Sequence, residues 1–190
     1  MFNKSKNNTK KLYGKLEVIC GSMFSGKTKE LIARLNKAKK DKLITMVIKP
    51  KIDNRYDKNK IVSHDKKFIA SKVTNSCDDI IQFSLQAQVV GIDEAQFYNK
   101  DLIYSCQKLI SLGKRVIIAG LDMDYSGKPF HPIPELMAIA DKVTKLHAKC
   151  EHCKNDALFS KRKNSNTSLI QLGEKNNYIP LCRTCFNEKC

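Results

Sequence analysis

Residues that could bind a nucleotide stand near the N-terminus, in the stretch Gly-Ser-Met-Phe-Ser-Gly-Lys-Thr at positions 21–28. Its spacing matches G-x-x-x-x-G-K-[ST], the pattern of a phosphate-binding loop. Glycines let successive backbone N–H groups face one anion, the lysine reaches the β- and γ-phosphates, and the threonine hydroxyl ligates Mg²⁺. The sequence therefore predicts a nucleoside-triphosphate site, with phosphate contacts from Gly21, Ser22, Met23, Phe24, Ser25, Gly26, Lys27 and Thr28.

Two acidic residues, Asp93 and Glu94, follow a short apolar run at 88–92. A buried strand that ends in aspartate, downstream of a phosphate-binding loop, is the Walker B arrangement. We expect Asp93 to hold Mg²⁺ together with Thr28, and its neighbour Glu94 to point elsewhere and accept a proton from a nucleophile. Such a pair can also be a helix cap or surface charge, but the loop in the same chain favours the catalytic interpretation.

Four cysteines form two Cys-x-x-Cys pairs near the C-terminus: Cys150, Cys153, Cys182 and Cys185. Two such pairs are typical of a tetrahedral zinc site, so we expect one structural Zn²⁺ in a small ribbon. The nearby His147 and His152 are not needed as ligands, and Cys190 falls outside the spacing. Cys20, Cys77 and Cys106 stand in apolar or helical contexts, and we expect them to be buried small hydrophobic residues.

Strands that alternate with helices are needed to position these groups. Short apolar runs predict strands at 16–20, 45–49, 88–92, 115–119 and 142–146, with β-like pieces at 61–64 and 67–70. Helical periodicity predicts helices at 28–40, 76–85, 101–112 and 132–140. The order predicts a doubly wound α/β fold with a RecA-like parallel sheet. The first helix would point its N-terminus at the phosphates.

Two loops carry further candidate residues. The polar segment 51–60 holds Asp53 and Arg55, which either bind and position phosphate or form a solvated pair. The loop 122–130 leaves the C-terminal end of a strand, where ligands bind in open α/β sheets. Its aromatic residues, Tyr125 and Phe130, either stack on a base or pack in the core.

Composition bounds the class of protein. The chain has 190 residues, a net charge of +16 and 42% hydrophobic residues, with no apolar run long enough to span a membrane. Its N-terminal residues are rich in Asn and Lys, unlike a secretory signal, and we expect a cytoplasmic location. The charge suggests nucleic acid, but the lysines are spread along the chain, so a solvated basic surface is favoured. We expect a disordered basic tail at 1–14, a nucleotide-binding domain at 15–146 and a zinc-binding domain at 147–190.

Taken together, the motifs resemble the thymidine kinases shared by bacteria, animal cytosol and poxviruses. The resemblance runs from about Lys15 to Phe186. It rests on the phosphate-binding loop, on Lys-Pro at 49–50 with Asp-Asn-Arg-Tyr at 53–56, and on Asp-Glu-Ala-Gln-Phe at 93–97. Gly-Leu-Asp at 120–122, Lys-Pro-Phe at 128–130 and the two cysteine pairs complete it.

The resemblance implies transfer of the ATP γ-phosphoryl group to the thymidine 5′-hydroxyl, giving dTMP for DNA precursor synthesis by nucleoside salvage. It implies Glu94 as proton acceptor, and phosphate contacts from the loop, Arg55 and Gln96. A lasso loop between the cysteine pairs would cover thymine and hold it largely by main-chain hydrogen bonds. The implied thymidine pocket is Met23, Phe97, Leu121, Tyr125, Phe130, Ser160, Leu169, Ile170, Gln171, Leu172, Gly173 and Tyr178. A homotetramer and feedback inhibition by dTTP are also implied. From composition, we expect no nucleic-acid or membrane partner.

A second function class is a nucleic-acid-dependent RecA-like ATPase that grips a strand with its zinc ribbon. Glu94 would then activate water instead of a sugar hydroxyl. The chain is short for such a motor, and the segment between the cysteine pairs offers only the basic run Lys161-Arg162-Lys163 to follow phosphates. The kinase interpretation is therefore favoured.

Overall fold

The computed structural model describes residues 14–53, 60–62, 68–163 and 177–188. Most of the expected basic tail therefore lies outside the described residues. So do Arg55 and the proposed lasso residues Leu169, Ile170, Gln171, Leu172 and Gly173.

The centre of the molecule is a six-stranded sheet in the order β5-β2-β6-β7-β1-β8, in which every neighbouring pair is parallel. Its strands are β1 (Lys15–Gly21), β2 (Thr45–Lys49), β5 (Lys72–Val73), β6 (Val89–Ile92), β7 (Arg115–Gly120) and β8 (Lys142–Leu146). The central strands are almost wholly buried and read as continuous apolar runs because both faces of the sheet are covered.

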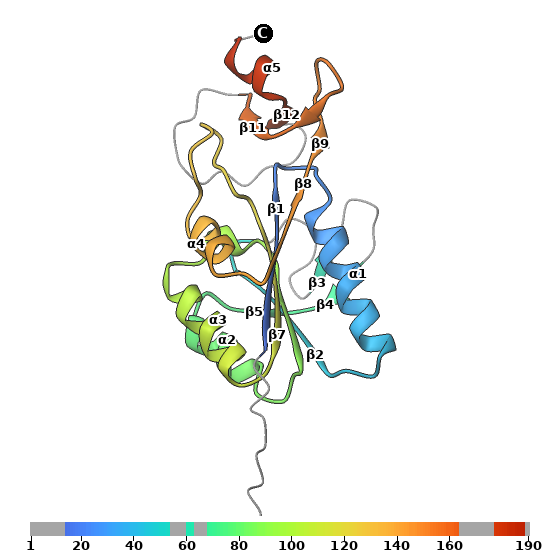
Figure 1. The fold of residues 1–190 in the computed structure, drawn as a ribbon, viewed down its shortest axis with the longest axis vertical. Coiled ribbons are helices and arrows are strands. Elements are labelled where there is room, and N and C mark those ends of the chain that lie inside the picture. The colour runs from blue at the N-terminus through green and yellow to red at the C-terminus, as the bar shows by residue number, and fades with distance from the viewer. Residues whose placement is uncertain (1–13, 54–59, 63–67, 164–176, 189–190) are drawn as a thin grey trace, which may run out of the picture.

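Helices cover both faces, as expected for a doubly wound fold (Figure 1). Helix α1 (Lys27–Lys40) packs on one face, where Leu31, Ile32 and Leu35 join a core with Ile19 and Ile117. The helices α2 (Cys77–Phe83), α3 (Asp101–Ser111) and α4 (Ile133–Ala138) lie on the other face. Alternate residues of one strand thus feed two separate cores.

The predicted boundaries differ from the observed ones by a few residues. Helix α2 ends at Phe83, two residues before the predicted end, and α4 ends at Ala138. Helix α3 ends at Ser111, and Gly113 lies just beyond it with φ 79°, the left-handed conformation in which a glycine commonly ends a helix. The two β-like pieces form the antiparallel pair β3 (Lys60–Val62) and β4 (Phe68–Ala70).

An ion-pair cluster joins β1, β7 and α1. Glu17 accepts hydrogen bonds from Arg115 Nε at 2.7 Å and from Arg34 Nη1 at 2.8 Å. Its side chain is 12% exposed. Burial raises the pKa of Glu17, but Arg115 and Arg34 outweigh that effect and hold the pKa below its usual value.

Beyond the sheet, the chain forms a small region of short strands. The pair β9 (Ala148–Lys149) and β10 (Asp156–Ala157) is antiparallel, as is the pair β11 (Phe159–Arg162) and β12 (Tyr178–Leu181), and α5 (Arg183–Asn187) follows. This region stands at the end of the sheet where β1 meets α1 (Figure 1). We call it the ribbon.

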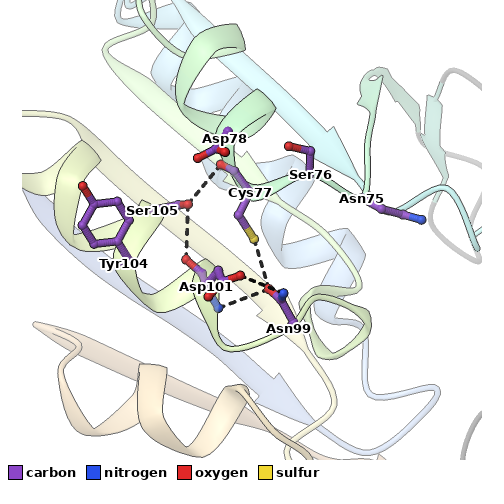
Figure 2. Close-up of a pocket in the computed structure, with 8 residues that line it drawn as sticks. All are labelled: Asn75, Ser76, Cys77, Asp78, Asn99, Asp101, Tyr104 and Ser105. Carbon is purple, nitrogen blue, oxygen red and sulfur yellow. Dashed lines mark hydrogen bonds between the residues drawn. The ribbon is translucent and has the colours of Figure 1, made fainter.

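Cys20 and Cys106 are buried, as predicted, and burial raises the pKa of Cys20 to about 11 and of Cys106 to about 12. The expectation for Cys77 was wrong, because Cys77 is half-buried at a polar hollow beside α2 and α3 (Figure 2). Its thiol approaches Asn99 Oδ1 at 3.4 Å, and its carbonyl accepts a hydrogen bond from Ser105. These contacts tie the start of α2 to α3.

Among the described residues, no helix has both the length and the apolar character needed to cross a membrane.

Candidate functional site

The phosphate-binding loop lies between β1 and α1, as predicted. Gly21 has φ 135°, and a Cβ there would lie 2.0 Å from the carbonyl oxygen of Leu146 on β8. Gly26 has φ 90° and precedes the first residue of α1. Both glycines are therefore required by backbone geometry, Gly21 also by the close approach of a neighbouring strand.

The lysine and threonine of the motif are both buried or partly buried at this turn. Lys27 Nζ donates to the carbonyl of Ser22, across the loop, at 2.8 Å. Thr28 Oγ1 donates to Asp93 Oδ2 at 3.0 Å, although the two residues are 65 positions apart. The fold thus brings the hydroxyl and the carboxylate that were expected at Mg²⁺ into direct contact, and an oxygen pair of this kind suits that ion.

Glu94 follows Asp93 at the end of β6 with φ 49°, a left-handed conformation that is uncommon outside glycine. The short helix η1 (Ala95–Phe97) follows at once and brings Gln96 beside it. Gln96 Nε2 donates to Glu94 Oε2 at 2.6 Å, and Gln96 Oε1 accepts from the Leu121 N–H at 3.0 Å. The phosphate contact expected of Gln96 stays a prediction.

Asp53 is not a solvated loop residue. It is 8% exposed, and Lys49 Nζ, which is itself buried at the end of β2, lies 3.9 Å from Asp53 Oδ2. The buried pair sits at the same end of the sheet as Asp93, since β2 and β6 are parallel neighbours. The burial of Asp53 contradicts the solvated-pair interpretation, and a contact between Asp53 and phosphate stays a prediction.

The loop from β7 to α4 carries Tyr125 and Phe130 and has a defined shape. Met123 and Pro129 form an antiparallel bridge across it, and the Asp124 carboxylate accepts hydrogen bonds from the backbone N–H groups of Ser126 and Lys128. At its end, the Phe130 ring meets the Phe97 ring edge to face at 6.4 Å. The loop and η1 thus share an aromatic contact at the proposed thymidine pocket.

The ribbon contacts the phosphate-binding loop directly. The Met23 N–H donates to Ser160 Oγ at 2.8 Å, and Ser22 Oγ donates to the Ala157 carbonyl at 3.2 Å. Gly127, in the loop from β7 to α4, packs so closely that a Cβ there would lie 3.1 Å from the Phe159 ring. Three segments from distant parts of the chain therefore meet here.

Arg162 is a residue of this junction that sequence reasoning missed. It is 7% exposed, its guanidinium lies 3.9 Å from the centre of the Tyr125 ring, and its Nη2 donates to Tyr178 Oη at 2.9 Å. In sequence, Arg162 stands out only as part of the basic run Lys161-Arg162-Lys163. Only its alternation on strand β11 could have signalled one inward side chain.

The four predicted cysteines gather at the ribbon. Their sulfur atoms all lie within 4.8 Å of one another. A tetrahedral site with metal–sulfur bonds of about 2.3 Å separates its sulfurs by about 3.8 Å. The spacing of the four sulfurs therefore suits a tetrahedrally coordinated metal ion. Burial raises the pKa of Cys150, but hydrogen bonds from the backbone of Cys153 and Cys182 outweigh it and lower the pKa. The pKa of Cys185 is raised instead, by a hydrogen bond with the Cys182 sulfur and by burial.

Several known proteins are similar to this chain. A thymidine kinase of Porphyromonas gingivalis is 51% identical over 177 residues, which cover 93% of this chain and 86% of that protein. Thymidine kinases of Bacteroides thetaiotaomicron (51% identity, 91% of this chain and 87% of that one) and of a Rhodothermus species (47%, 91% and 81%) are also similar. A solved structure, the genome packaging NTPase B204 from Sulfolobus turreted icosahedral virus 2, is similar at 16% identity and a TM-score of 0.47, over 71% of this chain and 75% of that one. The family model for thymidine kinase matches residues 14–186, and the chain belongs to the thymidine kinase family.

Proposed function

We propose that this protein transfers the γ-phosphoryl group of ATP to the 5′-hydroxyl of thymidine and so produces dTMP for nucleoside salvage. One observation carries the proposal. In a chain of the thymidine kinase family, the fold brings the phosphate-binding loop, Asp93 and Glu94 to one end of the sheet, beside an aromatic loop.

The phosphate end of the site is assigned to the loop from Gly21 to Thr28. Its backbone N–H groups and Lys27 would hold the β- and γ-phosphates, with Asp53 and Arg55 supporting them. Thr28 and Asp93 would hold Mg²⁺, which neutralises charge that develops on the phosphates.

Glu94 is assigned as the base. The 5′-hydroxyl must lose its proton as it attacks the γ-phosphorus in line, and a carboxylate within hydrogen-bond reach can take it. Most of the acceleration then comes from position and charge, since phosphoryl transfer leaves little covalent chemistry to the protein.

The nucleoside would lie beside the aromatic loop. The wall of this pocket would be formed by Met23, Phe97, Leu121, Tyr125 and Phe130, together with Ser160 and Tyr178 of the ribbon. The lasso residues 169–173 would cover the base and read its hydrogen-bonding edge through main-chain groups.

The ribbon is assigned a structural Zn²⁺ on its four cysteines, with a domain boundary near 146–147, where the six-stranded sheet ends. A ribbon of this size buries little apolar surface, so metal binding would supply much of its folding free energy. A homotetramer, feedback inhibition by dTTP and a cytoplasmic location complete the proposal. They are carried by membership of the family.

Product analysis tests the proposal. The protein is incubated with ATP, Mg²⁺ and each deoxynucleoside in turn, with single-stranded DNA as a separate arm. We expect dTMP from thymidine and good phosphorylation of deoxyuridine. Deoxycytidine should react far less well, because each buried polar group left unpaired by its edge costs roughly 1–3 kcal/mol. ATP hydrolysis that requires DNA and gives no dTMP would instead identify a nucleic-acid-dependent ATPase.

A further inference from the structure

Gln96 is buried between the ends of the neighbouring strands β6 and β7. It is 3% exposed. Each end of its amide has a partner: Nε2 donates to Glu94 Oε2 at 2.6 Å, and Oε1 accepts from the Leu121 N–H at 3.0 Å. One side chain therefore bridges the proposed base and the first residues of the loop that leads to the aromatic wall.

These partners allow only one orientation of the amide. A carboxylate accepts hydrogen bonds and a backbone N–H donates them, so a flipped amide would place oxygen against oxygen and N–H against N–H. The same logic excludes glutamate as an equivalent at this position, because its carboxylate would face that of Glu94. The arrangement fits glutamine in both length and polarity.

The surroundings hold this bridge in place. A Cβ on Gly120 would lie 3.0 Å from Gln96 Oε1 and 2.6 Å from Ile133 Cδ1, so the absence of a side chain at Gly120 leaves the room that the amide occupies. Glu94 leaves β6 in a left-handed conformation, and the Phe97 N–H bonds back to the Glu94 carbonyl at 3.1 Å. The backbone thus turns so that the side chains two residues apart meet.

We propose that Gln96 is the positioning residue of Glu94. It holds the carboxylate in one orientation and ties it to the main chain of Leu121, so that the base and the nucleoside wall keep a fixed relation. This inference rests on the proposed function, and it differs from a role of Gln96 as a phosphate contact. A positioning role acts on the chemical step, whereas a phosphate contact acts on ATP binding.

The first test is Gln96→Met, which keeps the length of the side chain and removes both hydrogen bonds. We expect kcat for thymidine phosphorylation to fall roughly 10–100-fold, as a misplaced reacting group does, with the KM for ATP within about twofold of the wild type. Gln88→Met is the matched control, because Gln88 precedes the other end of β6 and its Oε1 accepts from the Ile44 N–H. That variant should keep wild-type kcat.

A double-mutant cycle with Glu94→Gln separates positioning from general structural damage. If Gln96 acts through Glu94, then adding Gln96→Met to the Glu94→Gln variant should lower kcat less than about threefold. An equal loss in both backgrounds overturns the proposal, as does a higher KM for ATP with kcat unchanged. Gln96→Glu serves as the second variant and should lower kcat at least as much as Gln96→Met. Wild-type kcat in Gln96→Glu also overturns the proposal. If the wild type makes no dTMP, the proposed function itself fails.

Discussion

Replacing the buried Arg162 should destabilise the ribbon and weaken binding in the proposed thymidine pocket. Arg162→Met keeps most of the apolar stem but loses the charge-assisted hydrogen bond to Tyr178 Oη, worth about 1.5–3 kcal/mol. It also loses the stacking of the guanidinium on Tyr125, which at a desolvated site is worth about 2 kcal/mol. The methionine side chain recovers some apolar burial, so we expect a net destabilisation of about 2–4 kcal/mol.

Two measurements follow from this estimate. At ~2–4 °C per kcal/mol for a chain of this size, the unfolding midpoint should fall by about 5–15 °C. If Tyr125 and Tyr178 line the nucleoside pocket, loosening them by ~1.4 kcal/mol should raise the KM for thymidine about tenfold. The KM for ATP should change much less, because Tyr125 and Tyr178, which Arg162 contacts, are assigned to the nucleoside wall and not to the phosphates.

Matched variants sharpen this test. Lys161→Met removes the same charge from the opposite face of β11, where the side chain is not buried, and should be nearly neutral. Arg162→Lys keeps the charge but not the planar group, and should be intermediate. The reasoning is refuted if Arg162→Met matches Lys161→Met in both unfolding midpoint and KM for thymidine.

Three further predictions concern other parts of the molecule. Glu94→Gln should lower kcat by roughly 10²–10⁴-fold with near wild-type binding of ATP and thymidine, whereas Asp93→Asn should weaken Mg²⁺-dependent ATP binding. Calorimetric titrations and turnover measurements on both variants test this, and loss of ATP binding in Glu94→Gln but not in Asp93→Asn would show that the two roles are reversed. Cys182→Ser should lose metal and activity together, as metal analysis of the purified variant would show, and full activity without metal would contradict the ribbon's proposed role. Glu17→Gln should destabilise the protein at neutral pH. Because the pKa of Glu17 is lowered in the folded protein, the difference in unfolding free energy between the wild type and this variant should be constant above about pH 5 and should disappear as the pH falls below ~4. Denaturant titrations on both sides of this pH range measure it, and an equal difference at both would count against the Glu17–Arg115 pair.

Much of this fold could be predicted from sequence because its signals are local. The glycines of the loop, the apolar run before Asp93 and the helical period after Thr28 each follow from neighbouring residues, and the structure confirms the parallel sheet that they predict. The predicted end of α2 is two residues too late, since the last turn of a helix depends on what packs against it.

Contacts between distant segments could not be predicted. Nothing near Gln96 in sequence shows that the main chain of Leu121 completes its hydrogen bonding, and nothing in the basic run at 161–163 shows that the Arg162 side chain is the buried one. Cys77 was misplaced for a similar reason, because its helical context does not show that Asn99 and Ser105 form a polar hollow beside it. The resemblance to thymidine kinases supplied the wall residues, but not what holds them in place.

The hydrogen bonds from Met23 to Ser160 and from Ser22 to Ala157 make the ribbon part of the wall around the phosphate-binding loop. If metal binding orders the ribbon, then occupancy of the cysteine cluster and affinity for nucleotide must be linked, and linkage of this kind is reciprocal. ATP would strengthen metal binding by the same free energy with which the metal strengthens ATP binding. A chelator that competes with the cysteines for the metal would then weaken nucleotide binding.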